Sequence, residues 1–224
     1  MNQVRNRRSI GSPKLDDRCL LFFVKNPERG KVKSRLAVTI GEDSAVRLYK
    51  NLVTQMLSTL KRGSFPFCIC FTPRNAEKSI KNWLGREHRY MPQHGRDLGE
   101  RMKNGFLDGF AKGYKRVVLI GSDIPDLPKN SIEEAFQSLE ETDAVIGPAF
   151  DGGYYLIGFR QSAFSSQVFE EINWGTATVF DETMKKLKRL RRSVHTLPRL
   201  RDIDTVEDLN HLKGKPSFPH LYTF

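Results

Sequence analysis

The chain has 224 residues and a formal net charge of +11, with 37 Lys and Arg residues against 26 Asp and Glu residues. This length is sufficient for one large α/β domain with a sizeable core. No apolar run approaches the roughly 20 residues that a membrane-spanning helix needs, which argues against a membrane span. The three cysteines lack the spacing of a zinc or redox site, which favours a reduced, cytoplasmic protein.

Strand-like and helix-like patterns alternate along the chain, an order typical of a doubly wound, mostly parallel sheet. The expected strands cover residues 19–24, 67–71, 117–120, 144–146, 154–159 and 194–197. The expected helices cover residues 42–60, 76–84, 98–111, 131–139, 179–190 and 205–212. The strand at 154–159 follows Asp-Gly-Gly, which indicates a hairpin or an edge position. We expect one domain over residues 19–213, a basic and flexible arm at 1–18 and a tail at 214–224.

The run V-V-L-I-G-S-D ends on Asp123. Its four apolar residues predict a buried parallel strand, and open α/β sheets bind their ligands at the carboxyl ends of such strands. Asp123 is therefore a candidate for holding a divalent cation against a phosphate group. The alternative is that Asp123 only caps the following turn.

A basic loop follows the first expected strand, over residues 25–36. It has Gly30 as a point where the backbone can turn closely, and it matches neither the Walker loop nor the dinucleotide fingerprint. Its position at a strand end favours binding of a di- or triphosphate, and a solvated basic loop is the alternative. Its cations are Lys25, Arg29, Lys31, Lys33 and Arg35.

Two acidic segments lie near the expected ends of other strands. Asp151 precedes two glycines in a tight turn where backbone could approach a ligand, although local chemistry alone favours a simple hairpin turn. Asp202 and Asp204 precede a helix whose start is explained by Thr205 and Asp208, a near-match to a capping box. Alternation would place Asp202 and Asp204 on one side of an extended segment, where they could share a cation with Asp123. Oxygen ligands alone favour Mg²⁺ or Mn²⁺ over zinc.

Other function classes have weaker support. The basic run 185–192 predicts a helix with a solvated face and with Leu187 and Leu190 turned inward. Aromatic residues do not alternate with its cations, so nucleic-acid binding is disfavoured. The sequence contains neither a nucleophile elbow nor a Cys/His pairing, so it gives no indication of a hydrolase. Trp174 is interpreted as a packing residue or as a wall of a substrate site.

Five motifs occur in order over residues 19–212. They are F-V-K-N-P-E-R-G-K-V-K-S-R-L from Phe23, Q-H-G-R-D-L-G-E-R-M from Gln93, G-S-D-I-P-D-L from Gly121, G-P-A-F-D-G-G-Y-Y-L-I-G from Gly147 and D-I-D-T-V-E-D-L from Asp202. With these motifs the chain resembles the bacterial nucleotide-diphospho-sugar-transferase-like glycosyltransferases, also called selenodomain-associated transferases. The resemblance implies a single Rossmann-like, GT-A-type α/β domain with a mostly parallel twisted sheet and helices on both faces. Related phospholactate guanylyltransferases share the basic loop and the late acidic motif.

The resemblance also implies roles for individual residues. Asp123 and Asp204 would hold Mg²⁺ or Mn²⁺. Lys33 and Arg35 would neutralise the leaving phosphate, and Asp151 is the candidate general base. The nucleotide-binding set would comprise Lys25, Gly30, Lys33, Arg35, Gln93, Asp97, Leu98, Gly99, Arg101 and Ser122. The substrate-binding set would comprise Asp151, Gly152, Gly153 and Trp174. Ser34 replaces the usual threonine, and Arg96 replaces a glycine of the family pattern.

The function that follows is metal-dependent glycosyl transfer from a nucleotide-diphospho-sugar to a small-molecule acceptor. The alternative is a nucleotidyltransferase that joins a nucleoside triphosphate to a phosphorylated or acidic small molecule and releases pyrophosphate. A third hypothesis is a non-catalytic nucleotide-binding or nucleic-acid-binding protein. The acidic loops argue against it, because they would repel a polyanion.

Overall fold

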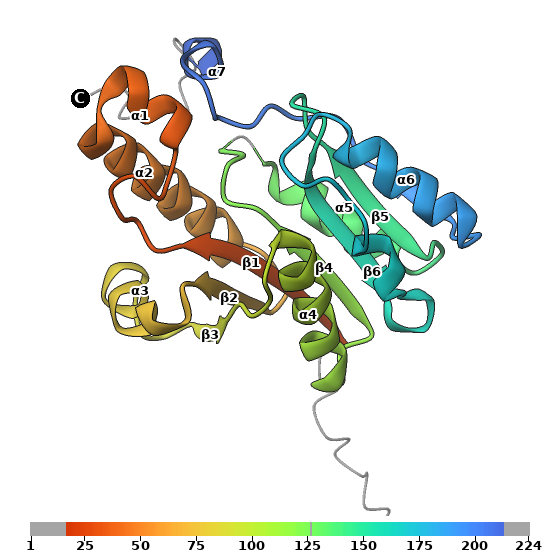
Figure 1. Cartoon of the computed structure of the whole chain (residues 1–224). Coiled ribbons are helices and arrows are strands. Elements are labelled where there is room, and N and C mark those ends of the chain that lie inside the picture. Colours follow the sequence, from red (N-terminus) through yellow and green to blue (C-terminus); the bar gives the residue numbers. More distant parts are fainter. Residues whose placement is uncertain (1–16, 126, 213–224) are drawn as a thin grey trace, which may run out of the picture.

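A computed structural model of the chain describes residues 17–125 and 127–212 (Figure 1). The expected arm at 1–18 lies almost wholly outside these residues, and the expected tail lies wholly outside them. The strands are β1 (Arg18–Lys25), β2 (Phe67–Thr72), β3 (Arg89–Pro92), β4 (Arg116–Ile120), β5 (Ala144–Pro148), β6 (Tyr154–Arg160) and β7 (Val194–Thr196). The α-helices are α1 (Ser34–Ile40), α2 (Glu42–Lys61), α3 (Glu77–Leu84), α4 (Leu98–Ala111), α5 (Lys129–Ser138), α6 (Val179–Arg189) and α7 (Val206–Leu212). Short 3₁₀ turns cover Arg74–Ala76, Gln161–Ala163 and Ser166–Phe169.

The strands form one seven-stranded sheet in the order β3-β2-β1-β4-β6-β5-β7. Strand β6 is antiparallel to both of its neighbours, β4 and β5, and all the other pairs are parallel. The expected mostly parallel α/β sheet is therefore confirmed. The expected hairpin of β5 and β6 is also present, but β6 lies inside the sheet and not at its edge.

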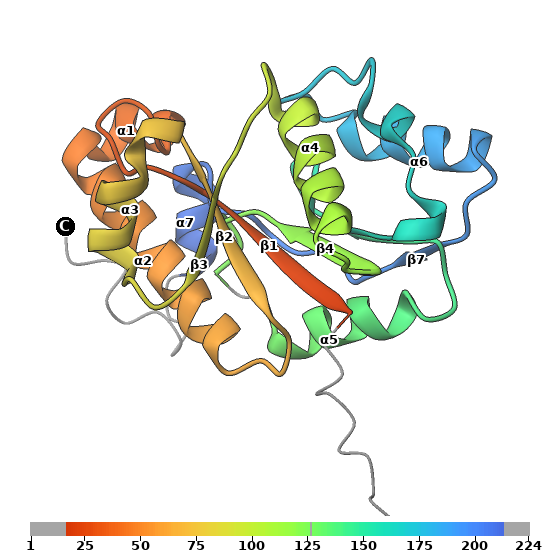
Figure 2. The same cartoon turned by 90° about the horizontal axis from the view of Figure 1, so that it is seen from below.

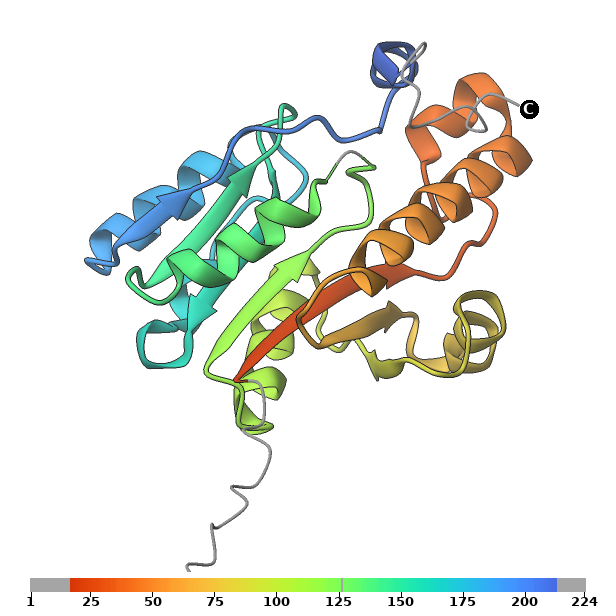
Figure 3. The ribbon, with the colours of Figure 1, turned by 180° about the vertical axis from the view of Figure 1, so that it is seen from behind.

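Helices cover both faces of the sheet, because its central strands are apolar on both sides. Leu20, Phe22 and Val24 of β1 belong to one buried cluster, and Leu21 and Phe23 belong to the other. The first cluster packs against α2, α3 and α5, and the second packs against α4 and α6 (Figures 2 and 3). Continuous burial of this kind is typical of parallel strands covered on both faces.

The second cluster includes two cysteines of β2 and, as expected, involves the two leucines of the basic run 185–192. Cys68 and Cys70 are buried on the same face of β2, where they fill the second cluster. Leu187 of α6 is buried, and Leu190 packs against the same cluster.

Within residues 17–125 and 127–212, none of the helices combines the length and the apolar character that crossing a membrane requires.

Two elements were not expected from the sequence. Helix α1 begins after Lys33, whose backbone is left-handed (φ 49°, ψ 43°) and whose side chain does not cap the helix. Strand β3 has only four residues and is defined by its pairing with β2. Neither element carries the capping or alternation signal by which short elements are recognised in a sequence.

Candidate active site

The carboxyl ends of β1 and β4 are joined by the hydroxyl of Tyr49 from α2. This hydroxyl accepts hydrogen bonds from the backbone N–H of Lys25 (2.8 Å) and from the Oγ of Ser122 (3.3 Å). Burial raises the pKa of Tyr49 well above its usual range, and the negative charge of Asp123 adds to the effect. The hydroxyl therefore stays neutral and fixes the two strand ends beside each other. The buried side chain of Ser122 points to Tyr49, while Lys25 is exposed at the end of β1.

Lys33 is the buried cation of this region, with a side chain only 4% exposed. Its ammonium donates to the carbonyl oxygen of Ile203 (2.5 Å) and forms an ion pair with Oδ1 of Asp123. A buried ammonium is costly unless it is paired and hydrogen-bonded, and both conditions are met here. The Asp123 side chain is 47% exposed, so the carboxylate is also open to a ligand.

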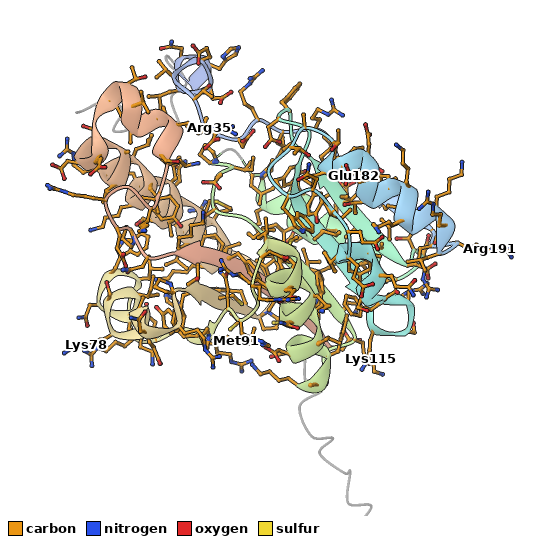
Figure 4. The ribbon with its side chains drawn as sticks, in the orientation of Figure 1. Arg35, Lys78, Met91, Lys115, Glu182 and Arg191 are labelled. Carbon is orange, nitrogen blue, oxygen red and sulfur yellow. The ribbon has the colours of Figure 1, made fainter. Side chains whose placement is uncertain are left out.

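The segment before α7 passes the carboxyl ends of the strands next to Asp123. The backbone N–H of Ile203 donates to the carbonyl oxygen of Asp123 (3.0 Å), and the Ile203 side chain is buried. Beside it, Nη1 of Arg35 lies 3.1 Å from Oδ2 of Asp204. Figure 4 labels Arg35 at this place, between α1 and the segment that leads into α7. Lys33, Arg35, Asp123 and Asp204 are thus brought together as two neighbouring ion pairs.

The Asp-Gly-Gly turn between β5 and β6 lies near the same edge. Oδ1 of Asp151 accepts a hydrogen bond from the N–H of Gly153 (2.8 Å). Gly152 has φ +88°, and a Cβ at this position would lie 2.1 Å from the carbonyl oxygen of Ala177. Only glycine fits there, because the turn rests directly on the backbone of the chain that precedes α6.

Asp202 lies near this turn. Burial and the nearby charge of Asp151 together raise the pKa of Asp202 to about 6, although the charge of Lys33 opposes the rise. Asp151, Asp202 and Lys33 therefore lie within one electrostatic neighbourhood. Asp202 was expected to share a cation with Asp204 and Asp123, but among the described residues no three such side chains are grouped to hold a metal ion. Its proximity to Asp151 was not expected from the sequence.

The segment from Gln93 to Arg101 has several structural roles. The side-chain amide of Gln93 donates to the carbonyl oxygen of Cys70 (2.7 Å), and Oδ1 of Asp97 caps α4 by accepting from the N–H of Glu100 (2.8 Å). Nε of Arg101 donates to the carbonyl oxygen of Gly95 (3.3 Å). These bonds fix the start of α4 at the end of β3, on the same edge of the sheet as Asp123.

Trp174 packs against the start of α4. A Cβ on Gly99 would lie 2.5 Å from Nε1 of Trp174, so the indole rests on the helix backbone. The same ring contacts Tyr154 and Phe169, at centroid distances of 6.5 Å. Packing therefore accounts for the position of Trp174, while Leu98 next to Gly99 is exposed.

Two further positions of the sequence motifs have clear conformations. Gly30 has φ +68°, which allows the basic loop to turn close to the side chain of Glu42. Arg29 of the same loop forms an ion pair with Asp43. Arg96, which replaces a glycine of the family pattern, is exposed and forms an ion pair with Glu100.

The donor set suits a hard cation that is shared with a phosphate ligand. Among the described residues, no group of three or more His, Cys, Asp or Glu side chains could hold a metal ion. Mg²⁺ is usually bound by one or two carboxylates, water and substrate phosphates, so a complete protein cage is not required. Asp123 and Asp204, two partly exposed carboxylates on adjacent segments, fit such a partial site.

Known proteins resemble the chain in sequence and in fold. A protein of Desulfovibrio desulfuricans G20, provisionally named a nucleotide-diphospho-sugar transferase, has 47% identity and a TM-score of 0.86, with 90% of each chain covered. The 2-phospho-L-lactate guanylyltransferase of Methanothermobacter thermautotrophicus is 32% identical over 120 residues, which are 51% of this chain and 51% of that enzyme. The chain thus matches about half the length of this curated relative.

A more distant structure shows the fold alone. It is a CMP:2-keto-3-deoxy-manno-octonic acid synthetase in complex with CTP, with 6% identity and a TM-score of 0.56 over 87% of this chain and 96% of that one. The likeness to nucleotide-diphospho-sugar-transferase-like proteins is thereby confirmed, and the fold is one that nucleotidyltransferases share. Residues 55–176, more than half of the chain, match the family described as uncharacterized proteins conserved in bacteria, so the chain belongs to DUF2064.

Proposed function

We propose that the chain is a nucleotidyltransferase, which transfers a nucleoside monophosphate from a nucleoside triphosphate to a small acceptor and releases pyrophosphate. The observation that carries the proposal is the buried ammonium of Lys33, which Asp123 and the carbonyl oxygen of Ile203 hold at the sheet edge. A fixed cation at this place suits a phosphate chain better than a neutral ligand. The guanylyltransferase that is 32% identical over half of this chain supports the choice.

The charges of the site match the charge that develops in this reaction. An acceptor oxygen bonds to the α-phosphorus, the bond from that phosphorus to the bridging oxygen breaks, and negative charge accumulates on the departing pyrophosphate. Lys33 and Arg35 would neutralise this charge, and Lys25 and the turn at Gly30 would contact the outer phosphates. Loss of one such preorganised contact typically costs ~3 kcal/mol in the barrier.

A divalent cation belongs to this proposal. Asp123 and Asp204 would hold Mg²⁺ or Mn²⁺ together with the phosphates of the nucleotide, and the ion would supply further neutralisation of the transferred group. The chain itself contributes Lys33, which holds Asp123 in place through their ion pair.

The two ends of the substrate would lie on opposite sides of Lys33. The nucleoside would face the Gln93–Arg101 segment, where Leu98 and Arg101 are accessible. The nucleotide would also pass close to Gly99 of this segment and to Ser122. The acceptor would face the turn of Asp151, Gly152 and Gly153. An acceptor phosphate is already anionic and needs no base, so positioning would supply most of the catalysis.

Glycosyl transfer from a nucleotide-diphospho-sugar is the second candidate, because a relative with 47% identity bears the name of such an enzyme. The same cations would then neutralise a departing nucleoside diphosphate. An acceptor hydroxyl would need a general base, and Asp151, exposed in its turn, is the candidate.

The two reactions release different products, so one experiment separates them. The protein is incubated with Mg²⁺, each nucleoside triphosphate and a set of phosphorylated, carboxylated and neutral acceptors, and pyrophosphate release is followed by ³¹P NMR. Parallel reactions contain UDP-, GDP- or dTDP-sugars in place of the triphosphate. Acceptor-dependent pyrophosphate release supports the proposal, whereas release of a nucleoside diphosphate from a nucleotide-sugar supports the second candidate and excludes the first.

A further inference from the structure

An exposed aromatic ring with two guanidinium groups lies beside the Asp151 turn. Phe150 is 55% exposed. The guanidinium carbon of Arg201 lies 4.9 Å from the centre of its ring, and that of Arg199 lies 5.8 Å from it. We call Phe150, Arg199 and Arg201 the arginine rim.

Backbone hydrogen bonds hold the arginine rim in place. The N–H of Phe150 donates to the carbonyl oxygen of Leu200, and the N–H of Leu200 donates to that of Pro148, each at 3.1 Å. Nη1 of Arg201 also lies 3.0 Å from Oδ1 of Asp208, whose carboxylate accepts a hydrogen bond from the N–H of Thr205 at the start of α7. The rim therefore continues the pairing of β5 with the chain after β7, and it is preorganised before any ligand arrives.

Topology places the arginine rim at the acceptor end of the proposed site. It follows β5 and β7, whereas the Gln93–Arg101 segment follows β3 at the opposite side of the sheet. Lys33 and Asp123 lie between them, next to β1 and β4. The rim is also continuous with the site, because Phe150 precedes Asp151 and Arg201 precedes Asp202.

The charges of the rim are not fully compensated. Arg201 is paired with Asp208, but no carboxylate of the described residues lies within ion-pair distance of Arg199. A guanidinium group that rests on an aromatic ring keeps its N–H groups available, and its planar fork matches the oxygens of carboxylates and phosphates. A neutral acceptor would form no ion pair with these guanidinium groups.

We infer that the arginine rim binds an oxyanion of the acceptor, so that the acceptor is a small molecule carrying a carboxylate or phosphate group. The inference rests on the proposed function only in that it identifies the bound anion as the acceptor of that reaction. The binding of an anion at the rim can nevertheless be measured without any reaction.

Calorimetric titration of three probes tests the inference. Glycerol 1-phosphate carries a phosphate, glycerate carries a carboxylate, and glycerol carries neither. We expect one of the two anions to bind the wild type and glycerol not to bind. Arg199→Gln and Phe150→Ala should each weaken that binding about tenfold or more, which corresponds to about 1.4 kcal/mol. Arg62→Gln, at an exposed arginine beyond the end of α2, is the matched control and should bind as the wild type does.

Two other outcomes overturn the inference, and a third separates it from the proposed function. If Lys33→Met abolishes anion binding while Arg199→Gln leaves it unchanged, the anion occupies the proposed nucleotide-phosphate site. If neither anion binds the wild type at millimolar concentration, the rim has no role with a small acceptor. If the anion binds at the rim but no nucleotide binds at all, the proposed function fails and the anion site stands.

Discussion

Lys33 is the residue on which the candidate site depends most, because its ammonium links Asp123 to the backbone of the segment before α7. Lys33→Met keeps the length and apolar stem of the side chain and removes the charge. We expect kcat/KM to fall about 100-fold, since loss of one contact to the developing charge costs ~3 kcal/mol. Steady-state kinetics with the substrate pair found by pyrophosphate release measures the effect.

Lys61→Met is the control for this substitution. Lys61 forms an ion pair with Glu87 at 3.2 Å, but on the surface beside the opposite edge of the sheet. Its loss should change kcat/KM less than twofold, because exposed ion pairs contribute little. A Lys33→Met protein with the wild-type circular dichroism spectrum and an unchanged kcat/KM would remove Lys33 from the mechanism.

Gly152 is fixed by a steric contact that can be measured separately from backbone strain. Gly152 and Gly113 have nearly the same φ, +88° and +89°, but only at Gly152 would a Cβ clash, 2.1 Å from the carbonyl oxygen of Ala177. We expect Gly113→Ala to lower the free energy of unfolding by about 1 kcal/mol. Gly152→Ala should lower it by roughly 3 kcal/mol or more. Urea unfolding measures both, and equal losses would contradict the close contact of the two loops.

Among the elements, those with a strong periodic signal could be predicted from the sequence. The apolar repeat over 42–60 predicts helix α2, observed as Glu42–Lys61, because burial of one helix face determines both the pattern and the fold. Helix α1 was missed, since it starts from a left-handed Lys33 without a capping side chain. Its start depends on the ion pair and hydrogen bond of Lys33, which are tertiary contacts.

The proximity of basic and acidic side chains at the candidate site was predictable from the sequence, but their pairing was not. Basic and acidic side chains at the carboxyl ends of strands were expected to converge, because these ends share one edge of the sheet. The pairing of Arg35 with Asp204 spans 169 positions of the chain, and only the path of the segment before α7 determines it. The proximity of Asp151 and Asp202 has the same origin, since it requires the turn between β5 and β6 to lie beside the segment before α7.

Asp143 joins three elements, and its contribution should depend on pH. Its carboxylate accepts hydrogen bonds from the N–H of Ser193 (3.0 Å), before β7, and from Arg160 (2.9 Å), at the end of β6. The backbone bond from Ser193 and the Arg160 guanidinium lower the pKa of Asp143. A lowered pKa in the folded state means that the stabilisation is present above the unfolded pKa, about 3.9, and is lost as the pH falls through the folded pKa.

We therefore expect Asp143→Asn to lower the free energy of unfolding by about 1 kcal/mol at pH 7 and by progressively less below pH 4. Urea unfolding between pH 3 and pH 7 measures the difference from the wild type. Glu141→Gln, at an exposed position on the preceding turn, should show no such dependence. A difference that stays constant over this range would show that the charge of Asp143 is not what matters.

At the scale of the whole molecule, the position of β6 determines where the Asp151 turn lies. Because β6 lies between β4 and β5 and is antiparallel to both, β4 and β5 run in the same direction, and the turn after β5 lies on the same side of the sheet as Asp123, which follows β4. The local sequence predicts this hairpin. The insertion of β6 between β4 and β5 and the addition of β7 beyond β5 arise from pairing between distant segments, which local patterns do not encode.

The whole chain should also report nucleotide binding through its thermal stability. A ligand that binds only the folded state at 100 times its Kd stabilises that state by about 2.7 kcal/mol. For a chain of this length, each kcal/mol raises Tm by roughly 2–4 °C. A saturating nucleoside triphosphate with Mg²⁺ should therefore raise Tm by about 5–10 °C in differential scanning fluorimetry.

EDTA should remove most of this shift, because without a cation Asp123 and Asp204 would repel the phosphates. Lys33→Met should reduce the shift even with Mg²⁺ present, whereas Lys61→Met should leave it unchanged. A shift that persists in EDTA would remove the metal from the proposal. A shift with nucleotide-diphospho-sugars and none with any triphosphate would favour glycosyl transfer, because the cations of the site would then select a sugar-bearing diphosphate over the longer and more highly charged triphosphate.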